Sequence, residues 1–150
     1  MWLHGGGWIV GSLDSHDALC RRLANRARCV VVGVDYRLAP EHPFPAALQD
    51  CVAAVQWVAD HGDEIGADPT RLAAGGDSAG GALAATVARR MRDSGVALAL
   101  QVLVYPITDS TFDRPSYERY GQGYNLLSAD MRWYWDQYAP GDQTNPGAAP

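Results

Sequence analysis

The stretch Gly75-Gly76-Asp77-Ser78-Ala79-Gly80-Gly81 decides the fold of this 150-residue chain. Before it, the short apolar run at 71–74 predicts a strand, and after it the pattern from Ala79 to about Asp93 predicts a helix. A serine on such a tight turn has its hydroxyl raised clear of the sheet, where it can act as a nucleophile. A phosphate-binding turn without a nucleophile is the alternative. It is disfavoured because the glycine spacing is wrong for a dinucleotide loop and no P-loop lysine follows.

Outward from this turn, short apolar runs alternate with helical patterns, which is typical of parallel β-α units. Further strands are predicted at 1–3, 29–35 and 98–105. Further helices are predicted at about 15–27, with Asp14 or Ser15 as cap, at 46–61, ended by Gly62, and at about 129–138, with Ser128 as cap. The prediction is an α/β fold with a mostly parallel sheet and flanking helices.

The run His4-Gly5-Gly6-Gly7 predicts the second half of a hydrolytic site. Consecutive glycines let bare backbone approach a substrate and turn its N–H groups toward it. Such donors stabilise the oxygen that gains charge when a carbonyl becomes tetrahedral. The candidate donors are the N–H groups of Gly5, Gly6 and Ala79. His4, which lies in this loop, is expected to brace it rather than to act as a base; a merely flexible glycine loop is the alternative.

Composition narrows the class of protein. The net charge of -5 argues weakly against nucleic acid or an anionic membrane as partner. Three cysteines without a Cys-x-x-Cys spacing favour free thiols in a reducing, cytoplasmic compartment and provide no zinc-ligand cluster. No apolar run reaches membrane-spanning length. No secretory signal leads the chain, but Met1-Trp2-Leu3 looks like the end of a strand, so a signal ahead of it stays open.

Three motifs in order carry a family resemblance: 4–8 (HGGGW), 35–47 (DYRLAPEHPFPAA) and 76–81 (GDSAGG). Together they closely resemble the bacterial hormone-sensitive-lipase-like esterases, whose fold is the α/β-hydrolase fold. The resemblance implies hydrolysis of short- to medium-chain carboxylic esters without cofactor or metal. It assigns Ser78 as the nucleophile, Gly5, Gly6 and Ala79 as the oxyanion hole, and His4, Gly7 and Asp77 as the supporting loops. The 35–47 segment is interpreted as structural, held by ion pairs among Asp35, Arg37 and Glu41.

The resemblance divides the chain into two parts. Residues 1–115 are predicted to be a partial α/β-hydrolase core, and residues 116–150 the start of a cap followed by a flexible tail. By this resemblance, the aromatic segment 117–138 lines the pockets for the acyl and alcohol parts of the ester. Aromatic residues at helical spacing, however, belong more often to a hydrophobic core. Both interpretations stay open.

One part of the family pattern is missing. All four histidines precede Ser78, whereas the family places an aspartate and then a histidine after it. Asp109 is the only acid near such a position, one strand too early. We therefore expect the 150 residues alone to be inactive and, with unpaired strands at both margins, poorly soluble. A non-catalytic, hydrolase-like receptor and an amidase or other acyl-transfer enzyme are the alternatives. Substrate, acyl length, stereochemistry and oligomeric state are not indicated.

Overall fold

Four short parallel strands form the centre of the computed structural model, which describes residues 1–150. The strands are β1 (Trp2–Leu3), β2 (Gly33–Val34), β3 (Ala73–Asp77) and β4 (Leu100–Val104), in the spatial order β2-β1-β3-β4. The helices are α1 (Leu13–Ala27), α2 (Ala46–His61), α3 (Ala79–Ser94), α4 (Pro115–Tyr120) and α5 (Ser128–Tyr138), with short 3-10 turns η1 (Gly62–Ile65) and η2 (Pro69–Arg71). The α/β architecture predicted from the sequence is confirmed.

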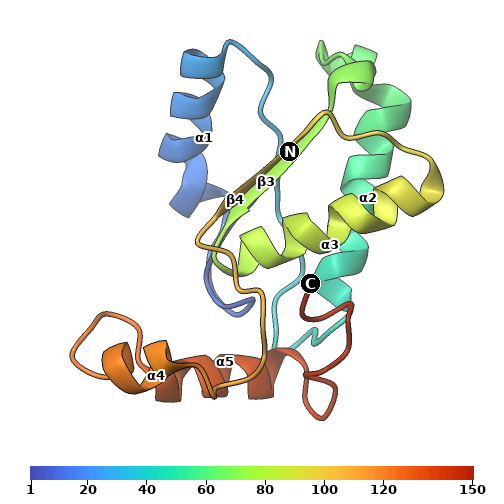
Figure 1. The fold of residues 1–150 in the computed structure, drawn as a ribbon. Coiled ribbons are helices and arrows are strands. Elements are labelled where there is room, and N and C mark those ends of the chain that lie inside the picture. Colours follow the sequence, from blue (N-terminus) through green and yellow to red (C-terminus); the bar gives the residue numbers. More distant parts are fainter.

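The helices form layers around this sheet. Helix α1 lies on one face, α2 and α3 lie on the other, and α4 and α5 lie below the ends at which the parallel strands finish (Figure 1). Helix α3 packs against β1, β3 and β4 and against α2, so it is the centre of the core. In open parallel sheets, ligands bind at the carboxyl ends of the strands. Here that edge faces α5.

The boundaries of several elements differ from those predicted. The apolar run at 29–35 pairs with β1 as a strand only at Gly33–Val34. Helix α1 begins earlier than expected because Ser12 is its cap, not Asp14 or Ser15: the Ser12 hydroxyl accepts from the Ser15 N–H (3.2 Å). Gly62 does not end α2 in a left-handed conformation. The chain continues through η1 to Gly66, which adopts φ 71°.

Helix α3 meets the sheet backbone to backbone. A Cβ on Gly80 would lie 2.0 Å from the carbonyl oxygen of Leu3, and one on Gly76 would lie 2.4 Å from the carbonyl oxygen of Gly80. Only glycine fits at these two positions, since both neighbours are main chain. This contact fixes how closely the first turn of α3 approaches β1. The helix begins at Ala79, one residue after Ser78.

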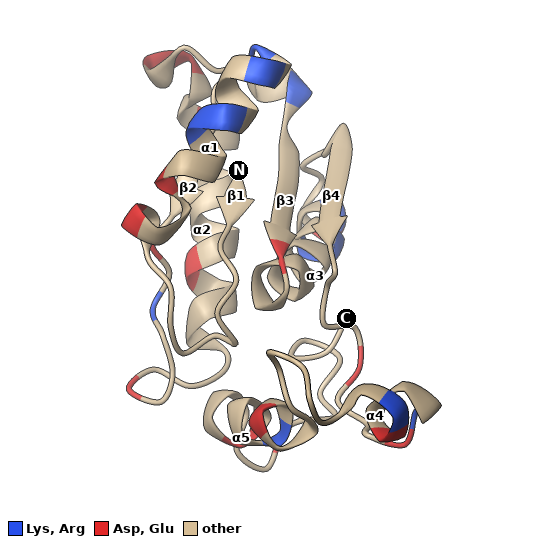
Figure 2. Ribbon diagram, turned by 90° about the vertical axis from the view of Figure 1, so that its left-hand side faces the viewer, with Lys and Arg blue, Asp and Glu red and all other residues tan.

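The sheet is less covered on the side of α1. Seen from that side, α1 lies in front of β1 and β2, whereas no helix lies in front of β3 and β4 (Figure 2). No residue of α1 is fully buried. On edge strand β4, Leu100 is 58% exposed. A groove of about 770 Å³ lies on this face, lined by apolar side chains that include Trp2, Leu23 and Val102.

The 35–47 segment is held differently from the prediction. The Arg37 guanidinium pairs with Asp50 on α2 (Nη2–Oδ1 2.8 Å), and the Arg37 N–H donates to the same carboxylate (2.9 Å). These hydrogen bonds from Arg37 hold the pKa of Asp50 below its ordinary value. Neither Asp35 nor Glu41 forms an ion pair, so the expected pairing was wrong. The partner lies outside the motif, 13 residues further along the chain.

The C-terminal residues fold back onto the molecule. Ala148 is buried in the core cluster, the Phe44 ring lies close to Gly147, and Arg89 donates to the carbonyl of Pro146. The buried face of α5 consists of Met131, Trp135 and Tyr138, so these members of the aromatic segment belong to the core. No helix in the structure combines the length and the apolar character needed to cross a bilayer.

Candidate active site

Ser78 lies at a strained turn between β3 and α3. Its backbone has φ 54° and ψ −120°, a conformation that non-glycine residues rarely adopt and that costs about 1–3 kcal/mol. Three hydrogen bonds hold it: its N–H donates to Val104 (2.9 Å), and its carbonyl accepts from Ala82 (3.1 Å) and Ile107 (3.3 Å). The Ser78 residue itself remains partly exposed. The strand-turn-helix context predicted for this serine is present.

The glycine loop lies directly beside this turn. A Cβ on Gly5 would come within 2.3 Å of the Asp77 carboxylate, so the Gly5 backbone is in contact with the residue before Ser78. Gly6 (φ 125°) begins a tight turn in which its carbonyl accepts from Ile9 and Val10. The N–H groups of Gly5 and Gly6 donate to no backbone carbonyl. Neither N–H is therefore occupied by a backbone hydrogen bond within the chain.

The third predicted donor comes from α3. Ala79 is the first residue of that helix, so its N–H has no intrahelical acceptor. The positive end of the helix dipole lies at the same place and favours negative charge there. Two separate segments, the glycine loop and the start of α3, thus contain N–H groups without a backbone acceptor.

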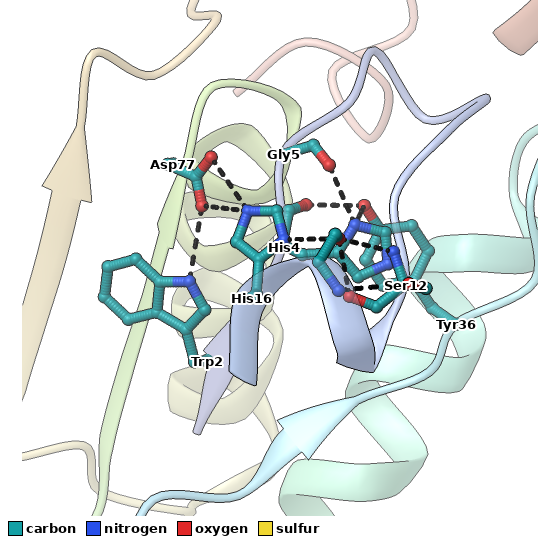
Figure 3. Close-up of polar contacts among 8 residues, drawn as sticks. Trp2, His4, Gly5, Ser12, His16, Tyr36 and Asp77 are labelled. Atoms are coloured by element: carbon teal, nitrogen blue, oxygen red, sulfur yellow. Dashed lines mark hydrogen bonds and ion pairs between the residues drawn. The ribbon is translucent and has the colours of Figure 1, made fainter. Parts of the chain in front are cut away.

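His4 is buried behind the glycine loop. Its Nδ1 lies 2.8 Å from the carbonyl of Gly5 and must carry a proton, because a carbonyl only accepts. The Tyr36 hydroxyl donates to the His4 carbonyl (2.6 Å), and the two rings stack at 4.2 Å. Burial lowers the pKa of His4, so its imidazole is neutral near pH 7. His4 and Tyr36 together fix the start of the loop (Figure 3).

Asp77 is held by side chains from two other elements. The Trp2 indole N–H donates to its Oδ1 (3.3 Å), and His16 Nε2 lies 3.4 Å from its Oδ2 (Figure 3). Sequence reasoning gave no role to Trp2, His16 or Tyr36. Tyr36 lies within the 35–47 motif, which was the only available signal. Nothing in the pattern around Trp2 or His16 points toward residue 77.

Helix α5 closes the other side of the glycine loop. The Tyr134 ring occupies the space that a Cβ on Gly7 would need, at 2.2 Å. Trp8 (φ 62°) is fully buried; its ring stacks on Tyr138 (4.2 Å, 5°) and meets Trp135 at 4.8 Å. The loop that carries the candidate donors is therefore packed between the core and α5.

Comparison with known proteins identifies the family to which this chain belongs. The family model described as "alpha/beta hydrolase fold" matches residues 1–150, the whole chain. This chain belongs to the alpha/beta hydrolase fold family. The resemblance to hormone-sensitive-lipase-like esterases is thereby confirmed.

Named esterases are among the relatives of this chain. It is 45% identical to an ethyl acetate hydrolase of Pseudomonas putida, matching 100% of this chain and 48% of the relative. It is 46% identical to the carboxylic ester hydrolase LipN of Mycobacterium tuberculosis (97% and 40%). A solved hyperthermophilic esterase from the archaeon Pyrobaculum calidifontis superposes with a TM-score of 0.94 at 46% identity, matching 99% of this chain and 51% of that structure. The chain thus spans about half the length of the relatives it matches.

Three of the chain's four histidines form side-chain hydrogen bonds, and none of these goes to Ser78. The hydrogen bonds of His4 go to Gly5 and Tyr36, those of His16 to Ser15 and Asp77, and that of His61 to the carbonyl of Trp57. His42 makes no side-chain hydrogen bond. None of the four is bonded to Ser78, and no group of three or more His, Cys, Asp or Glu side chains is placed to hold a metal ion.

The acid closest in sequence to a triad position belongs to a surface loop. Asp109 accepts from Arg114 (2.8 Å) and from the N–H and hydroxyl of Thr111. The Arg114 hydrogen bond, followed by those from Thr111, lowers the pKa of Asp109 to about 2. No histidine forms a hydrogen bond to Asp109. Its partners Thr111 and Arg114 lie within five residues, so its carboxylate stabilises the surface loop.

Proposed function

We propose that this protein is a serine carboxylesterase in which Ser78 is the nucleophile and the N–H groups of Gly5, Gly6 and Ala79 stabilise the oxyanion. The single observation that supports this most is the strained Ser78 turn with the Gly5 backbone in contact with the preceding residue. A strained, partly exposed serine at the start of a helix fits nucleophilic chemistry. Named ester hydrolases among the relatives are consistent with it.

The proposed reaction is acyl transfer through the serine. The Ser78 oxygen bonds to the ester carbonyl carbon while its proton passes to a base, and the carbonyl oxygen becomes an anion facing the three N–H groups. Collapse of this intermediate breaks the bond to the alcohol, which leaves with the proton. Water then repeats the sequence on the acyl-enzyme and releases the carboxylic acid. Each N–H donor is expected to contribute about 100- to 1,000-fold in turnover.

The base is proposed to come from outside residues 1–150. Each histidine that makes a side-chain hydrogen bond directs it away from Ser78. The chain spans 48% of the P. putida relative, so a protein of similar length would have room for an acid and an imidazole. Residues 1–115 would then supply the nucleophile and oxyanion hole, and residues 116–150 the start of a cap. The contact of Tyr134 with Gly7 supports the cap assignment.

The proposed substrates are small carboxylic esters, with ethyl acetate and p-nitrophenyl butyrate as first probes. Ethyl acetate is chosen because a relative is named for its hydrolysis. The mechanism needs no cofactor, since the electrons that move belong to the serine, the ester and water. This chemistry also suits an amide, so a p-nitroanilide of the same acyl chain separates esterase from amidase activity.

The test uses protein expressed from its complete reading frame. We expect hydrolysis of p-nitrophenyl butyrate and covalent labelling by a fluorophosphonate, both abolished in Ser78→Ala and both retained in the control Ser110→Ala, a loop serine. Labelling reports the nucleophile independently of substrate choice. A protein that is neither labelled nor active would support a hydrolase-like receptor instead, and Ser78→Ala with parent turnover would refute the assignment of the nucleophile.

A further inference from the structure

The oxyanion hole of the proposed esterase is divided between two chain segments. Gly5 and Gly6 follow β1, whereas Ala79 begins α3 after β3, more than 70 positions later in the sequence. Both sets of N–H groups must converge on one oxygen, because a displacement of about 1 Å can cost 100-fold in rate. Some contact must therefore fix the glycine loop relative to the serine turn.

The Asp77 side chain lies between these two segments. Its Oδ2 occupies the space beside the Gly5 Cα, at 2.3 Å from where a Cβ would be, and its main chain leads directly into Ser78. The Asp77 side chain is 13% exposed and is therefore shielded from water on most sides. Its position sets how closely the loop approaches the turn.

Two donors orient that carboxylate. The Trp2 indole N–H donates to Oδ1 (3.3 Å) from β1, and His16 Nε2 lies 3.4 Å from both carboxylate oxygens from α1. Trp2 directly precedes Leu3 and His4, which lead into the glycine loop. The contact from His16 is the only one by which α1 reaches the serine turn through a side-chain hydrogen bond.

The His16 ring is also held at its other nitrogen, on the side away from Asp77. Its Nδ1 lies 2.9 Å from the Ser15 hydroxyl, which also contacts the carbonyl and the N–H of Ser12. The hydroxyl has one proton to donate, either to His16 Nδ1 or to the Ser12 carbonyl. When the hydroxyl donates to Nδ1, the proton of the neutral imidazole lies on Nε2 and faces Asp77. The capping box of α1 thus aims this N–H at the carboxylate.

We infer that His16, acting through Asp77, is a positioning residue that holds the Gly5–Gly6 loop and the Ser78–Ala79 turn in the geometry of one oxyanion hole. The inference rests on the proposed esterase function. His16 makes its hydrogen bonds to Ser15 and Asp77 and none to Ser78, so we assign it no role as the base of the reaction. Its loss leaves the nucleophile present and misplaces the donors, which lowers transition-state stabilisation while substrate binding persists.

The test compares three variants of the protein expressed from its complete reading frame. His16→Leu removes the N–H and keeps most of the side-chain volume. His16→Gln keeps an N–H donor near the position of Nε2. His61→Leu is the matched control, because His61 lies at the exposed end of α2 and bonds only to a carbonyl of its own helix. Active sites are counted by fluorophosphonate labelling, so that loss of folded protein does not imitate loss of turnover.

We expect kcat per labelled site to fall about 10- to 100-fold in His16→Leu, with KM within about twofold of the parent. The inhibition constant of an alkyl trifluoromethyl ketone, whose hemiketal oxygen occupies the oxyanion hole, should rise by a similar factor. His16→Gln should recover most of kcat, and the His61 control should equal the parent. A merely structural role would lower the number of labelled sites without changing kcat or the inhibition constant.

The outcomes separate this inference from the proposed function. Parent values of kcat in His16→Leu, or equal losses in the Leu and Gln variants, would overturn the role of His16 while leaving Ser78 in place. Activity that survives Ser78→Ala would overturn the esterase assignment first. Should His16→Leu not fold, Trp2→Phe removes the second donor to Asp77 and decides the question: a fall of about 10-fold in kcat at constant KM supports the inference, and no change refutes it.

Discussion

Replacing Gly80 by alanine tests the backbone-to-backbone contact on which the serine turn depends. The added methyl group would lie 2.0 Å from the carbonyl oxygen of Leu3 and 2.5 Å from that of His4, and ordinary contact begins at 3.4 Å. Helix α3 or strand β1 must therefore move by more than 1 Å. Overpacking costs about 1–3 kcal/mol, and the upper end applies because both neighbours are main chain. We expect a loss of about 3 kcal/mol, or about 6–12 °C in Tm for a domain of this size.

The matched control is Gly62→Ala. Gly62 has right-handed backbone angles (φ −55°, ψ −35°), and a methyl group there would meet its first neighbour at an ordinary 3.4 Å. Alanine should be neutral or stabilise by about 0.4–1 kcal/mol through the unfolded state. Thermal and urea unfolding measure both variants, and p-nitrophenyl butyrate turnover should fall only in Gly80→Ala. A Gly80→Ala protein that melts within about 2 °C of the parent would refute the close approach of α3 to β1.

Two further predictions concern the base of the glycine loop. Tyr36→Phe removes the hydroxyl that donates to the buried His4 carbonyl and should cost about 1–3 kcal/mol in urea unfolding, whereas Tyr124→Phe, at an exposed tyrosine, should cost nothing measurable. The pKa of His4 is lowered by burial, so the unfolded chain binds a proton that the folded chain excludes once the pH falls below the ordinary value of 6.5. Stability should therefore be fully present above pH 6.5 and decline below it, by at most about 1.4 kcal/mol per pH unit from this residue. The difference between the parent and His4→Gln, followed by Tm from pH 7.5 to 5, isolates this contribution, and parallel curves would contradict it.

Elements with strong local patterns were predictable from the sequence. Helix α2 has the predicted bounds because its buried residues, such as Leu48, Cys51 and Val55, recur at three- and four-residue spacing. The strand expected at 29–35 was overestimated, because an apolar run does not reveal how much neighbouring strand is available to pair with it.

In the candidate site too, the residues in local motifs could be predicted and those that act through long-range contacts could not. Ser78 and the glycine loop could be predicted because each lies in a contiguous motif with a physical reason for its glycines. The residues that hold them could not, since Trp2 and His16 lie 75 and 61 positions from Asp77. Even within a motif, the sequence did not identify the partner of a charged residue. Arg37 was correctly expected to form an ion pair, but its partner is Asp50 on α2 and not Asp35 or Glu41.

The aromatic contact between the glycine loop and α5 gives the molecule an optical signal of its own. The indoles of Trp8 and Trp135 lie 4.8 Å apart at 52°, a separation and tilt at which their electronic transitions couple through space. Far-ultraviolet circular dichroism, where the strong indole transition absorbs, should carry the resulting pair of opposite-signed bands. Their disappearance would report that α5 has left the loop, without label or substrate, on the timescale of a stopped-flow record.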